Sequence, residues 1–348
     1  MAKKRATLNQ QIETFRNHGV TFIKMKESQA RDFLTYNTYY YKLKTYENNY
    51  PKAATGENYQ YVGLDISYLV ELSLLDFALS RLVTSLCSNI EHGIKTDMNR
   101  LIMDCSDENI ASECVHRFLA IRGNFEIHDS PYTNGIQEQC HHHDYAPWHL
   151  WELLTLNDQI LLYETLFQQV KHKELPGKHL LFIMRKMRNA VSHGNCLFAD
   201  MSRSTTAIST SELAMPDIEV TEKAMNMCGR KPKISKRKSS FQTALDRLVV
   251  NNYAAVLLCH LHYVNSPRAL LHACDEVDGF ITRVNLHREE YFGSKGINHQ
   301  RNPLINSTLN ALIVLSQGYI EKAQDKARNM SSNDAYHDDT SGTSGLGD

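Results

Sequence analysis

The sequence predicts an all-α protein, and three observations support this prediction. Apolar residues recur every three or four positions along most of the chain, as they do on one face of a helix. Proline, which helix interiors exclude, is scarce, with 8 among 348 residues. Alternating apolar and polar residues, which are typical of half-buried strands, are few; Glu219 to Thr221 and the region around Phe125 are weak candidates.

The longest predicted helix carries one apolar stripe at spacings of three and four residues. The stripe consists of Leu69, Leu72, Leu75, Leu79, Leu82, Leu86 and Ile90. Further helices are predicted over residues 151–167, 180–192, 245–264, 269–284 and 304–320. A Pro176-Gly177 break precedes the 180–192 helix, and Ser266-Pro267 ends the 245–264 helix. These elements together predict a helical bundle.

The segments without this apolar pattern divide the chain. We expect an N-terminal helical element over residues 1–56 and a helical core over residues 57–198 and 241–330. Residues 199–240 are mixed in character and end in a basic run, so we interpret them as an exposed basic insertion. Residues 331–348 are polar with small side chains, and we expect this tail to be disordered because it buries too little apolar surface.

Composition and charge bound the class of protein. The 38 Lys and Arg residues nearly balance the 39 Asp and Glu residues, so overall charge argues neither for nor against a nucleic-acid partner. The 8 cysteines form no CxxC pairs, and we interpret them as reduced thiols of an intracellular protein. The N-terminal residues contain no apolar secretory segment, and no apolar run is long enough to span a bilayer. We therefore expect a cytoplasmic protein without a membrane partner.

The helix over residues 180–192 ends in a cluster of polar groups, in the stretch MRKMRNAVSHGN. Arg188 and His193 lie about 140° apart around a helix axis, so they share no strict face. Asn189 and His193 nearly share one, and the long Arg188 guanidinium can reach round from the flank. Gly194 is a natural residue to end the helix. One helix end can thus present a guanidinium, an amide and an imidazole to the same small volume.

These groups suit attack by a ribose 2′-hydroxyl on its neighbouring phosphate. The His193 imidazole can give and take a proton, and the Arg188 guanidinium matches phosphate oxygens with two parallel donors. Arg188 would stabilise the charge that develops on the phosphorane, and the reaction needs no metal or other cofactor. The same spacing also arises by chance, so a helix cap without a catalytic role is the alternative interpretation of this stretch.

Several blocks in order resemble a known family. Arg188-Asn189 followed by His193 resembles the R-x4-6-H signature of HEPN domains. NTYYYKLKTY at residues 37–46 resembles an N-terminal block of the Abi-like proteins, the bacterial abortive-infection group AbiD/AbiF. The helix over residues 68–95 is similar to another block of that family through Asp76, Arg81 and Glu91. WHLWELLTLNDQILLYETL follows in the order that the family shows. The resemblance covers most of residues 7–265.

The resemblance implies a HEPN-type helical bundle and a role in phage defence by abortive infection. Relatives with HEPN domains are typically metal-independent RNases, and many act as homodimers in which two R-x4-6-H helices form one composite cleft. By this match Arg188, Asn189 and His193 are the expected catalytic residues. Glu91 matches by pattern and would either orient His193 or pair with Arg188.

The sequence also departs from the family pattern. Gly194-Asn195-Cys196 stands where relatives often carry a further histidine and a basic residue or asparagine. Lys95 stands where arginine is common, and residues 200–240 are extra. These departures leave Arg188 and His193 in place. The family's contacts after the histidine, and the way in which it orients RNA, do not carry over to this sequence with them.

Three other clusters have two interpretations each. The basic run Arg230, Lys231, Lys233, Lys236, Arg237 and Lys238 could bind RNA phosphates or form a solvated linker. The tyrosines of residues 36–46 could stack on bases or pack against the bundle, and we favour packing. The His-rich segment 140–149 lies in an expected loop over residues 124–147. It lacks ligand pairs at helical spacing, so we expect no metal site there.

Three hypotheses follow for the function. The first is an endoribonuclease of phage defence that acts as a homodimer, with RNA as its substrate. The second is an RNA-binding or sensor module that holds a structured RNA without cutting it. Either would need a controlling partner, RNA or an antitoxin-like protein, because an unrestrained RNase harms its host. The third is a helical interaction protein in which the Arg188 to His193 stretch caps a helix.

Overall fold

The computed structural model describes residues 5–53, 59–123, 130–140, 145–205, 218–232, 238–293, 295 and 302–340. Within these ranges the chain is helical, and its only extended pairings are isolated bridges. The all-α prediction is therefore confirmed. The helices are α1 Leu8–Asn17, α2 Glu27–Tyr36, α3 Tyr40–Thr45, the 3-10 helix η1 Tyr46–Asn49, α4 Ile66–Met103, α5 Ile110–Arg122, α6 Asn134–Gln139, α7 Pro147–Leu153, α8 Leu156–Lys171, α9 Lys178–Ser192, α10 Ile218–Met227, α11 Ser240–Leu245, α12 Leu248–Tyr263, α13 Pro267–Leu286, α14 Arg288–Tyr291 and α15 Pro303–Thr340.

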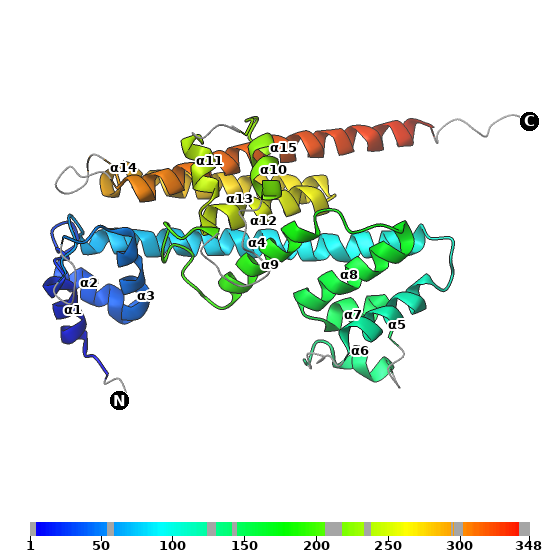
Figure 1. Cartoon of the computed structure of the whole chain (residues 1–348), viewed down its shortest axis with the longest axis horizontal. Helices are drawn as coiled ribbons and strands as arrows, with labels where there is room; N and C mark the ends of the chain where they lie inside the picture. Colours follow the sequence, from blue (N-terminus) through cyan, green and yellow to red (C-terminus); the bar gives the residue numbers. More distant parts are fainter. Residues whose placement is uncertain are drawn as a thin grey trace, which may run out of the picture.

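Helix α4 is the axis of the molecule and runs along most of its length (Figure 1). All seven residues of the predicted leucine and isoleucine stripe are buried along it. Asp65 begins the helix, because its carboxylate accepts a hydrogen bond from the Ser67 N–H at 3.0 Å. The amphipathic pattern of this segment thus positions every other element around one long helix.

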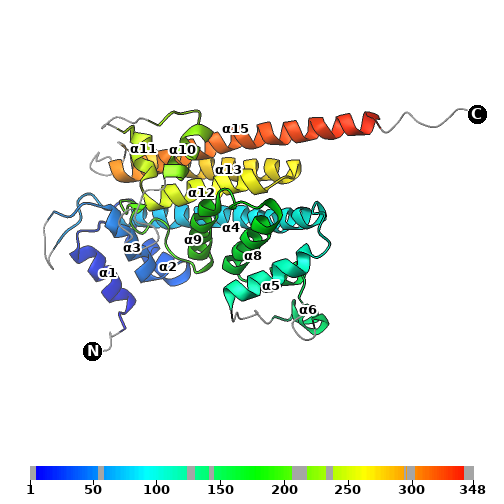
Figure 2. The same ribbon diagram turned by 45° about the vertical axis from the view of Figure 1, so that its right-hand side comes forward.

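Helices α9, α12 and α13 pack against the middle of α4, and α15 packs on α12 and α13. Helix α12 contacts α4, α9 and α15, and α13 lies between α4 and α15. Figures 1 and 2 both show α15 and α13 on one side of α4 and α9 on the other. Hydrogen bonds between buried side chains join these layers, such as that between the Tyr253 and Ser316 hydroxyls at 2.8 Å. The central bundle therefore has one continuous apolar core.

Helices α5, α7 and α8 form a smaller group against the C-terminal half of α4 (Figure 1). The Arg122 Nε donates to the buried Asp158 carboxylate at 2.6 Å, which ties α5 to the beginning of α8. The loop expected over residues 124–147 contains the short helix α6. Within it, residues 124–129 and 141–144 lie outside the described residues.

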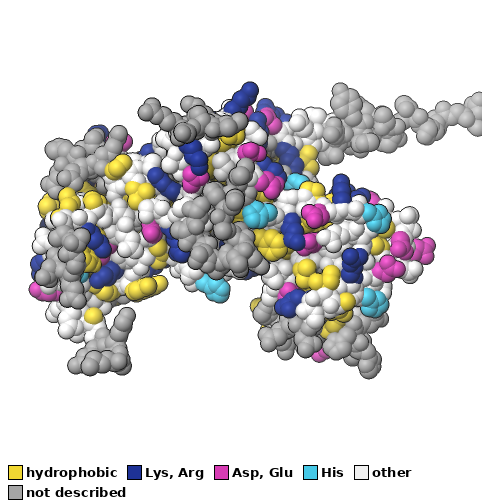
Figure 3. Space-filling view, in the orientation of Figure 1, with side chains coloured by type: hydrophobic (Ala, Val, Ile, Leu, Met, Phe, Trp, Pro, Cys, Tyr) yellow, Lys and Arg dark blue, Asp and Glu magenta, His cyan; other side chains and the backbone are white. Residues whose placement is uncertain are grey.

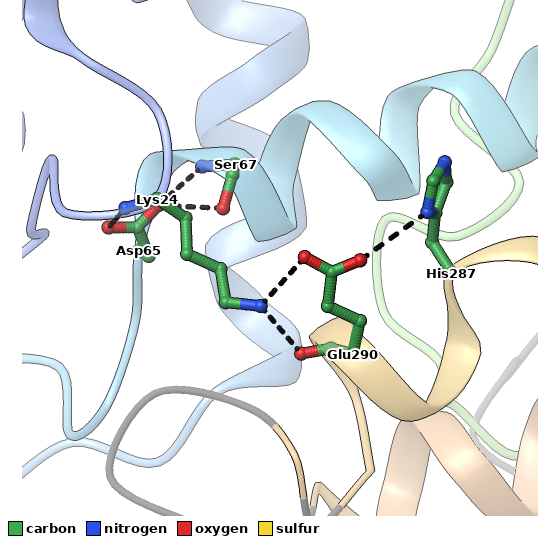
Figure 4. Close-up of polar contacts among 5 residues, drawn as sticks. All are labelled: Lys24, Asp65, Ser67, His287 and Glu290. Carbon is green, nitrogen blue, oxygen red and sulfur yellow. Dashed lines mark hydrogen bonds and ion pairs between the residues drawn. The ribbon is translucent and has the colours of Figure 1, made fainter.

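The N-terminal helices α1, α2 and α3 lie against the other end of α4, as Figure 1 shows. Figure 4 shows how they are attached. The Asp65 carboxylate accepts from Ser67, as this view draws. It also accepts from the Ile23 N–H at 2.7 Å, so one residue caps α4 and holds the segment after α1. The Lys24 ammonium donates to Glu290 on α14, whose carboxylate lies 3.6 Å from His287 Nδ1. The N-terminal element is thus joined to both α4 and the C-terminal half.

Two segments differ from the sequence expectations. The expected exposed insertion, residues 199–240, contains α10, which packs against α12 and α15. Val220, Ala224 and Met227 are buried there because their spacing gives this short helix an apolar stripe of its own. Helix α15 continues to Thr340, into the tail 331–348 that the sequence predicts to be disordered, and residues 341–348 of that tail lie outside the described residues. Extending a helix that is already nucleated costs little, which favours this continuation.

Among the described helices, none combines the length and apolar character that crossing a bilayer requires.

Candidate functional site

The candidate site begins where α9 ends. His193 is the C-cap of the helix, and Gly194 follows with a φ of 66°, in the left-handed region that favours glycine. The Asn195 N–H donates to the Ala190 carbonyl at 2.9 Å, and the Gly194 N–H donates to the Val191 carbonyl at 3.1 Å. These two bonds form a Schellman motif and satisfy carbonyls that the helix would leave unpaired. The predicted role of Gly194 as the helix stop is confirmed.

Arg188 is held from across the helix interface. Its Nε donates to the Glu91 carboxylate of α4 at 2.8 Å. The two side chains are 35% and 22% exposed, so the pair lies at the surface edge of the α4–α9 contact. Of the two roles expected for Glu91, the structure places it against Arg188. Within the described part of the chain the two Nη groups of Arg188 make no hydrogen bond, which leaves the fork of the guanidinium open.

Asn189 and His193 both face solvent at the same helix end. The His193 N–H donates to the Asn189 carbonyl at 3.0 Å, which fixes the backbone of the last turn. Their side chains make no hydrogen bond to another described residue. We call the group formed by Glu91, Arg188, Asn189 and His193 the α9-end site. It presents a positioned cation and two exposed polar side chains.

A buried polar cluster anchors the chain immediately after this site. The Asp76 carboxylate of α4 accepts from the Phe198 N–H at 2.9 Å. The Asn49 amide donates to the Phe198 carbonyl at 2.8 Å, and its oxygen accepts from the Met201 N–H at 2.8 Å. Burial raises the pKa of Asp76 to about 6, an effect that the Phe198 bond and the nearby Lys42 ammonium partly offset. The segment that leaves the α9-end site is therefore held rigidly on α4 and η1.

A groove of about 800 Å³ lies beside the α9 end. Its walls come from α4 and α13, and Val191, Gly194 and Asn195 close one part of it. Three cationic and one anionic residue line it, namely Lys42, Arg81, Arg283 and Glu276. Arg283 is engaged by Glu71 through two bonds of 2.6 and 3.0 Å, and Glu276 accepts from the Ser85 hydroxyl at 2.8 Å. No sequence pattern indicates this groove, because helices distant in the chain form it.

Comparison with known families adds one observation to this geometry. Residues 33–199 match the family model of the Abi-like proteins. This Abi-like region extends from the second half of α2 to the segment after α9, and contains Asp76, Glu91, Arg188 and His193. Helices α10 to α15 lie outside it. Neither the curated proteins nor the solved structures gave a match to this chain.

The basic run follows the Abi-like region in the sequence. Figures 1 and 2 both place α10 and α11, which flank the run, on the α15 side of α12, whereas α9 lies on the α4 side. The Arg230 guanidinium lies 4.8 Å from the centre of the Phe241 ring, and Lys238 donates to the Asp246 carboxylate at 2.7 Å. Lys231 is exposed. The other predicted RNA-binding residues, Lys233, Lys236 and Arg237, lie outside the described residues.

The His-rich segment is only partly described. Residues 141–144, which include three adjacent histidines, lie outside the described residues. His149 lies in the first turn of α7, where its Nδ1 accepts from the Ala146 N–H at 3.2 Å. In the part of the chain that the structure describes, no three His, Cys, Asp or Glu residues gather as metal ligands would. The described histidine of this segment thus has a structural partner at a helix start.

Proposed function

We propose that this protein is a metal-independent endoribonuclease of the HEPN type that acts in abortive-infection defence. Two findings support the proposal. Residues 33–199 match the Abi-like family, whose name indicates abortive infection. The α9-end site lies within that match and carries the residue types that RNA cleavage by the 2′-hydroxyl needs.

One observation carries the proposal more than any other. Glu91 binds the Nε of Arg188, and the Nη fork makes no hydrogen bond among the described residues, while the exposed His193 lies at the same helix end. A guanidinium anchored in this way is oriented through its Nε, and its two Nη groups can donate to the oxygens of a phosphate. Phosphoryl transfer uses a positioned cation to stabilise the charge of its transition state and an imidazole to move the proton, and this helix end carries both residue types.

The proposed reaction proceeds in one displacement. His193 removes the proton of a ribose 2′-hydroxyl, and the oxygen attacks the adjacent phosphorus. The bond from phosphorus to the 5′-oxygen breaks, and the leaving oxygen takes a proton, which yields a 2′,3′-cyclic phosphate and a 5′-hydroxyl end. Arg188 stabilises the charge on the phosphorane oxygens. In a homodimer the second copy would supply a second imidazole, so that one acts as base and the other as acid.

Incubation of end-labelled RNA with the purified protein in the presence of a chelator tests this proposal. We expect cleavage without added metal and its loss in His193→Ala. His116→Ala, which removes an exposed histidine of α5, is the matched control and should cut normally. Cleavage that persists in His193→Ala would exclude the proposed role of this residue.

The second candidate function is an RNA-binding module that does not cut. The pairing of Arg188 with Glu91 favours it, because a partly neutralised cation can hold RNA while offering less charge to a transition state. Under this alternative the unsubstituted protein binds RNA without cutting it. His193→Ala would then leave binding unchanged, whereas Arg188→Ala would weaken it. A regulatory RNA or an antitoxin-like protein would be the expected partner in either case.

A further inference from the structure

Three tyrosines of the N-terminal element are strongly exposed. Tyr36 is 82% exposed, Tyr39 57% and Tyr41 76%. In the described part of the chain, Tyr132 is the one other tyrosine with comparable exposure. Figure 3 shows hydrophobic and cationic side chains mixed over the surface of the N-terminal helices, at the left of the view. We call Tyr36, Tyr39 and Tyr41 the tyrosine platform.

Packing explains the neighbouring tyrosines and does not explain the platform. Tyr46 is fully buried, and the Tyr40 ring lies 5.2 Å from that of Phe15, edge to face. The packing favoured by the sequence analysis therefore applies to these two. The platform rings contact no other aromatic ring and no cation among the described residues. Three large rings exposed within six residues do not stabilise the fold, and such exposed apolar surface is typical of a binding site.

The platform is linked along the chain to the groove beside the α9-end site. Lys42 follows Tyr41 on α3 and lines that groove together with Arg81 of α4. The Arg81 guanidinium lies 5.9 Å from the centre of the Phe77 ring, so a cationic and an aromatic side chain also lie together in the groove. The groove reaches Gly194 and Asn195, which directly follow His193. Exposed rings thus precede Lys42 in the chain, and the groove that Lys42 lines extends to the residues after α9.

We propose that the tyrosine platform binds unpaired bases of a single-stranded RNA and directs the strand into the groove toward the α9-end site. Tyrosine rings stack on any base, which requires that the base be unpaired. Lys42 and Arg81 would take the phosphates. Asp32 lies one helical turn before Tyr36, so the phosphates follow the Lys42 side of the platform. This inference rests on the proposed function, for which it names the form of the substrate and its path.

Fluorescence anisotropy with a labelled 2′-O-methyl RNA of about 12 nucleotides tests the path, a length typical of single-strand sites. This probe lacks the attacking hydroxyl, so binding is measured on an intact strand whether or not the protein cuts. The variant Tyr36→Ala/Tyr39→Ala/Tyr41→Ala should lose at least about tenfold in affinity. Tyr132→Ala, at another exposed tyrosine, should bind like the unsubstituted chain. The variant Tyr36→Phe/Tyr39→Phe/Tyr41→Phe, which keeps the rings, should bind nearly as well.

Four results would overturn the inference. The first is that the triple alanine variant binds the single strand as tightly as Tyr132→Ala, and the second is that the unsubstituted chain does not bind it. The third is that the triple alanine variant loses as much affinity for a duplex of the same length. The fourth is that the triple alanine variant sediments differently but keeps its RNA affinity. The last would assign the platform to a contact between copies. Failure of the proposed function is seen separately, because it appears as unchanged cleavage of ordinary RNA by His193→Ala. Circular dichroism melting confirms that each variant folds.

Discussion

Arg188 and Glu91 form a partly exposed ion pair between α9 and α4. Pairs of this kind contribute only about 0–1 kcal/mol to stability. Their value at this position lies in orientation, since the bond at Nε limits the directions that the guanidinium fork can take. At the scale of single residues, the site therefore depends on geometry more than on the strength of the pair.

We predict that Arg188→Lys lowers RNA cleavage at least about tenfold, because one ammonium cannot both bind Glu91 and present a two-pronged donor to a phosphate. The free energy of unfolding should change by less than about 1 kcal/mol. Single-turnover cleavage and urea unfolding of the same preparation measure the two effects. Arg117→Lys, at an exposed arginine of α5, is the control. Full activity in Arg188→Lys would show that charge alone suffices.

His260 predicts a pH dependence of stability. Its ring is fully buried, where Nδ1 lies 2.8 Å from the Tyr319 hydroxyl and Nε2 lies 3.3 Å from the Asn89 amide. Burial lowers the pKa of His260 to about 4, and the Lys326 ammonium adds to this effect. In the unfolded state this histidine takes up a proton near pH 6.5, whereas in the folded state it does so only near pH 4. The contribution of His260 to the free energy of unfolding is therefore full above pH 6.5 and falls as the pH drops from 6.5 toward 4.

The substitution His260→Gln should therefore destabilise the protein less at low pH than at neutral pH. Relative to the unsubstituted chain, its deficit in free energy of unfolding should shrink by about 2 kcal/mol between pH values of roughly 7.5 and 5. Urea unfolding at both pH values measures this difference. Comparison of variants is needed because Asp76, with its raised pKa, changes stability in the opposite direction. A deficit that stays constant with pH would contradict a buried neutral imidazole.

Elements distant in the chain are joined by a few polar residues. The Asn49 side chain of η1 donates to the Phe198 carbonyl and accepts from the Met201 N–H, in the segment that follows α9. The Asp76 carboxylate of α4 accepts from the Phe198 N–H. These bonds satisfy buried backbone groups that lie outside any helix. At the scale of elements, they connect the N-terminal helices to the end of α9.

The variant Asn49→Ala should lose roughly 2–4 kcal/mol of unfolding free energy, because each buried group left unpaired costs about 1–3 kcal/mol. Urea unfolding measures the loss, and faster amide hydrogen exchange over residues 195–201 should accompany it. Asn48→Ala is the matched control, since the exposed Asn48 makes one long bond of 3.4 Å to the Ala199 carbonyl. Equal stability of the two variants would show that the anchor is not needed.

Gly93 allows α4 and α12 to cross closely. A Cβ at this position would lie 2.5 Å from the Tyr263 carbonyl oxygen, which is backbone and cannot move aside. Gly93→Ala should therefore destabilise the protein by about 1–3 kcal/mol. Gly279→Ala, where no atom lies within 4 Å of the added Cβ, should stabilise α13 by roughly 0.5–1 kcal/mol. Thermal melting measures both effects: the melting temperature should fall in Gly93→Ala and rise in Gly279→Ala. A change in the same direction in both variants would refute this prediction.

The whole molecule is organised by α4, with α1 to α3 at one end, α5 to α8 at the other and the central bundle between them (Figure 1). The α9-end site faces outward from this arrangement, and Asn189 and His193 have no described partner within the chain. A site that is open to solvent on one side can be completed by a second copy with the same surface. Such a composite site would contain two of each residue.

We predict that the protein sediments as a dimer of twice the 39.9 kDa chain mass. The specific cleavage rate should fall on dilution through the dimer dissociation range, because a monomer holds half a site. Analytical ultracentrifugation and cleavage assays over the same concentrations test this together. A monomer with undiminished specific activity would show that one α9-end site is sufficient.

The sequence predicted those features that depend on local order along the chain. The leucine stripe of α4, the helix over residues 180–192 and its stop at Gly194 are each encoded within a few turns, so periodicity and capping rules identified them. The short helix α10 was missed because its apolar stripe is only three residues long within a polar segment. A stripe of that length does not stand out from a loop in the sequence.

By itself the sequence determined the all-α class, the polar residues at the end of α9 and the Abi-like order of its blocks, since each depends on neighbours in the chain. The tertiary structure alone decided that Glu91 meets Arg188, that Asn49 and Asp76 hold Phe198, and that α4 and α13 enclose a groove beside Gly194. These contacts join residues about one hundred or more positions apart. Such contacts depend on how whole helices pack, and spacing along one helix carries no record of that packing.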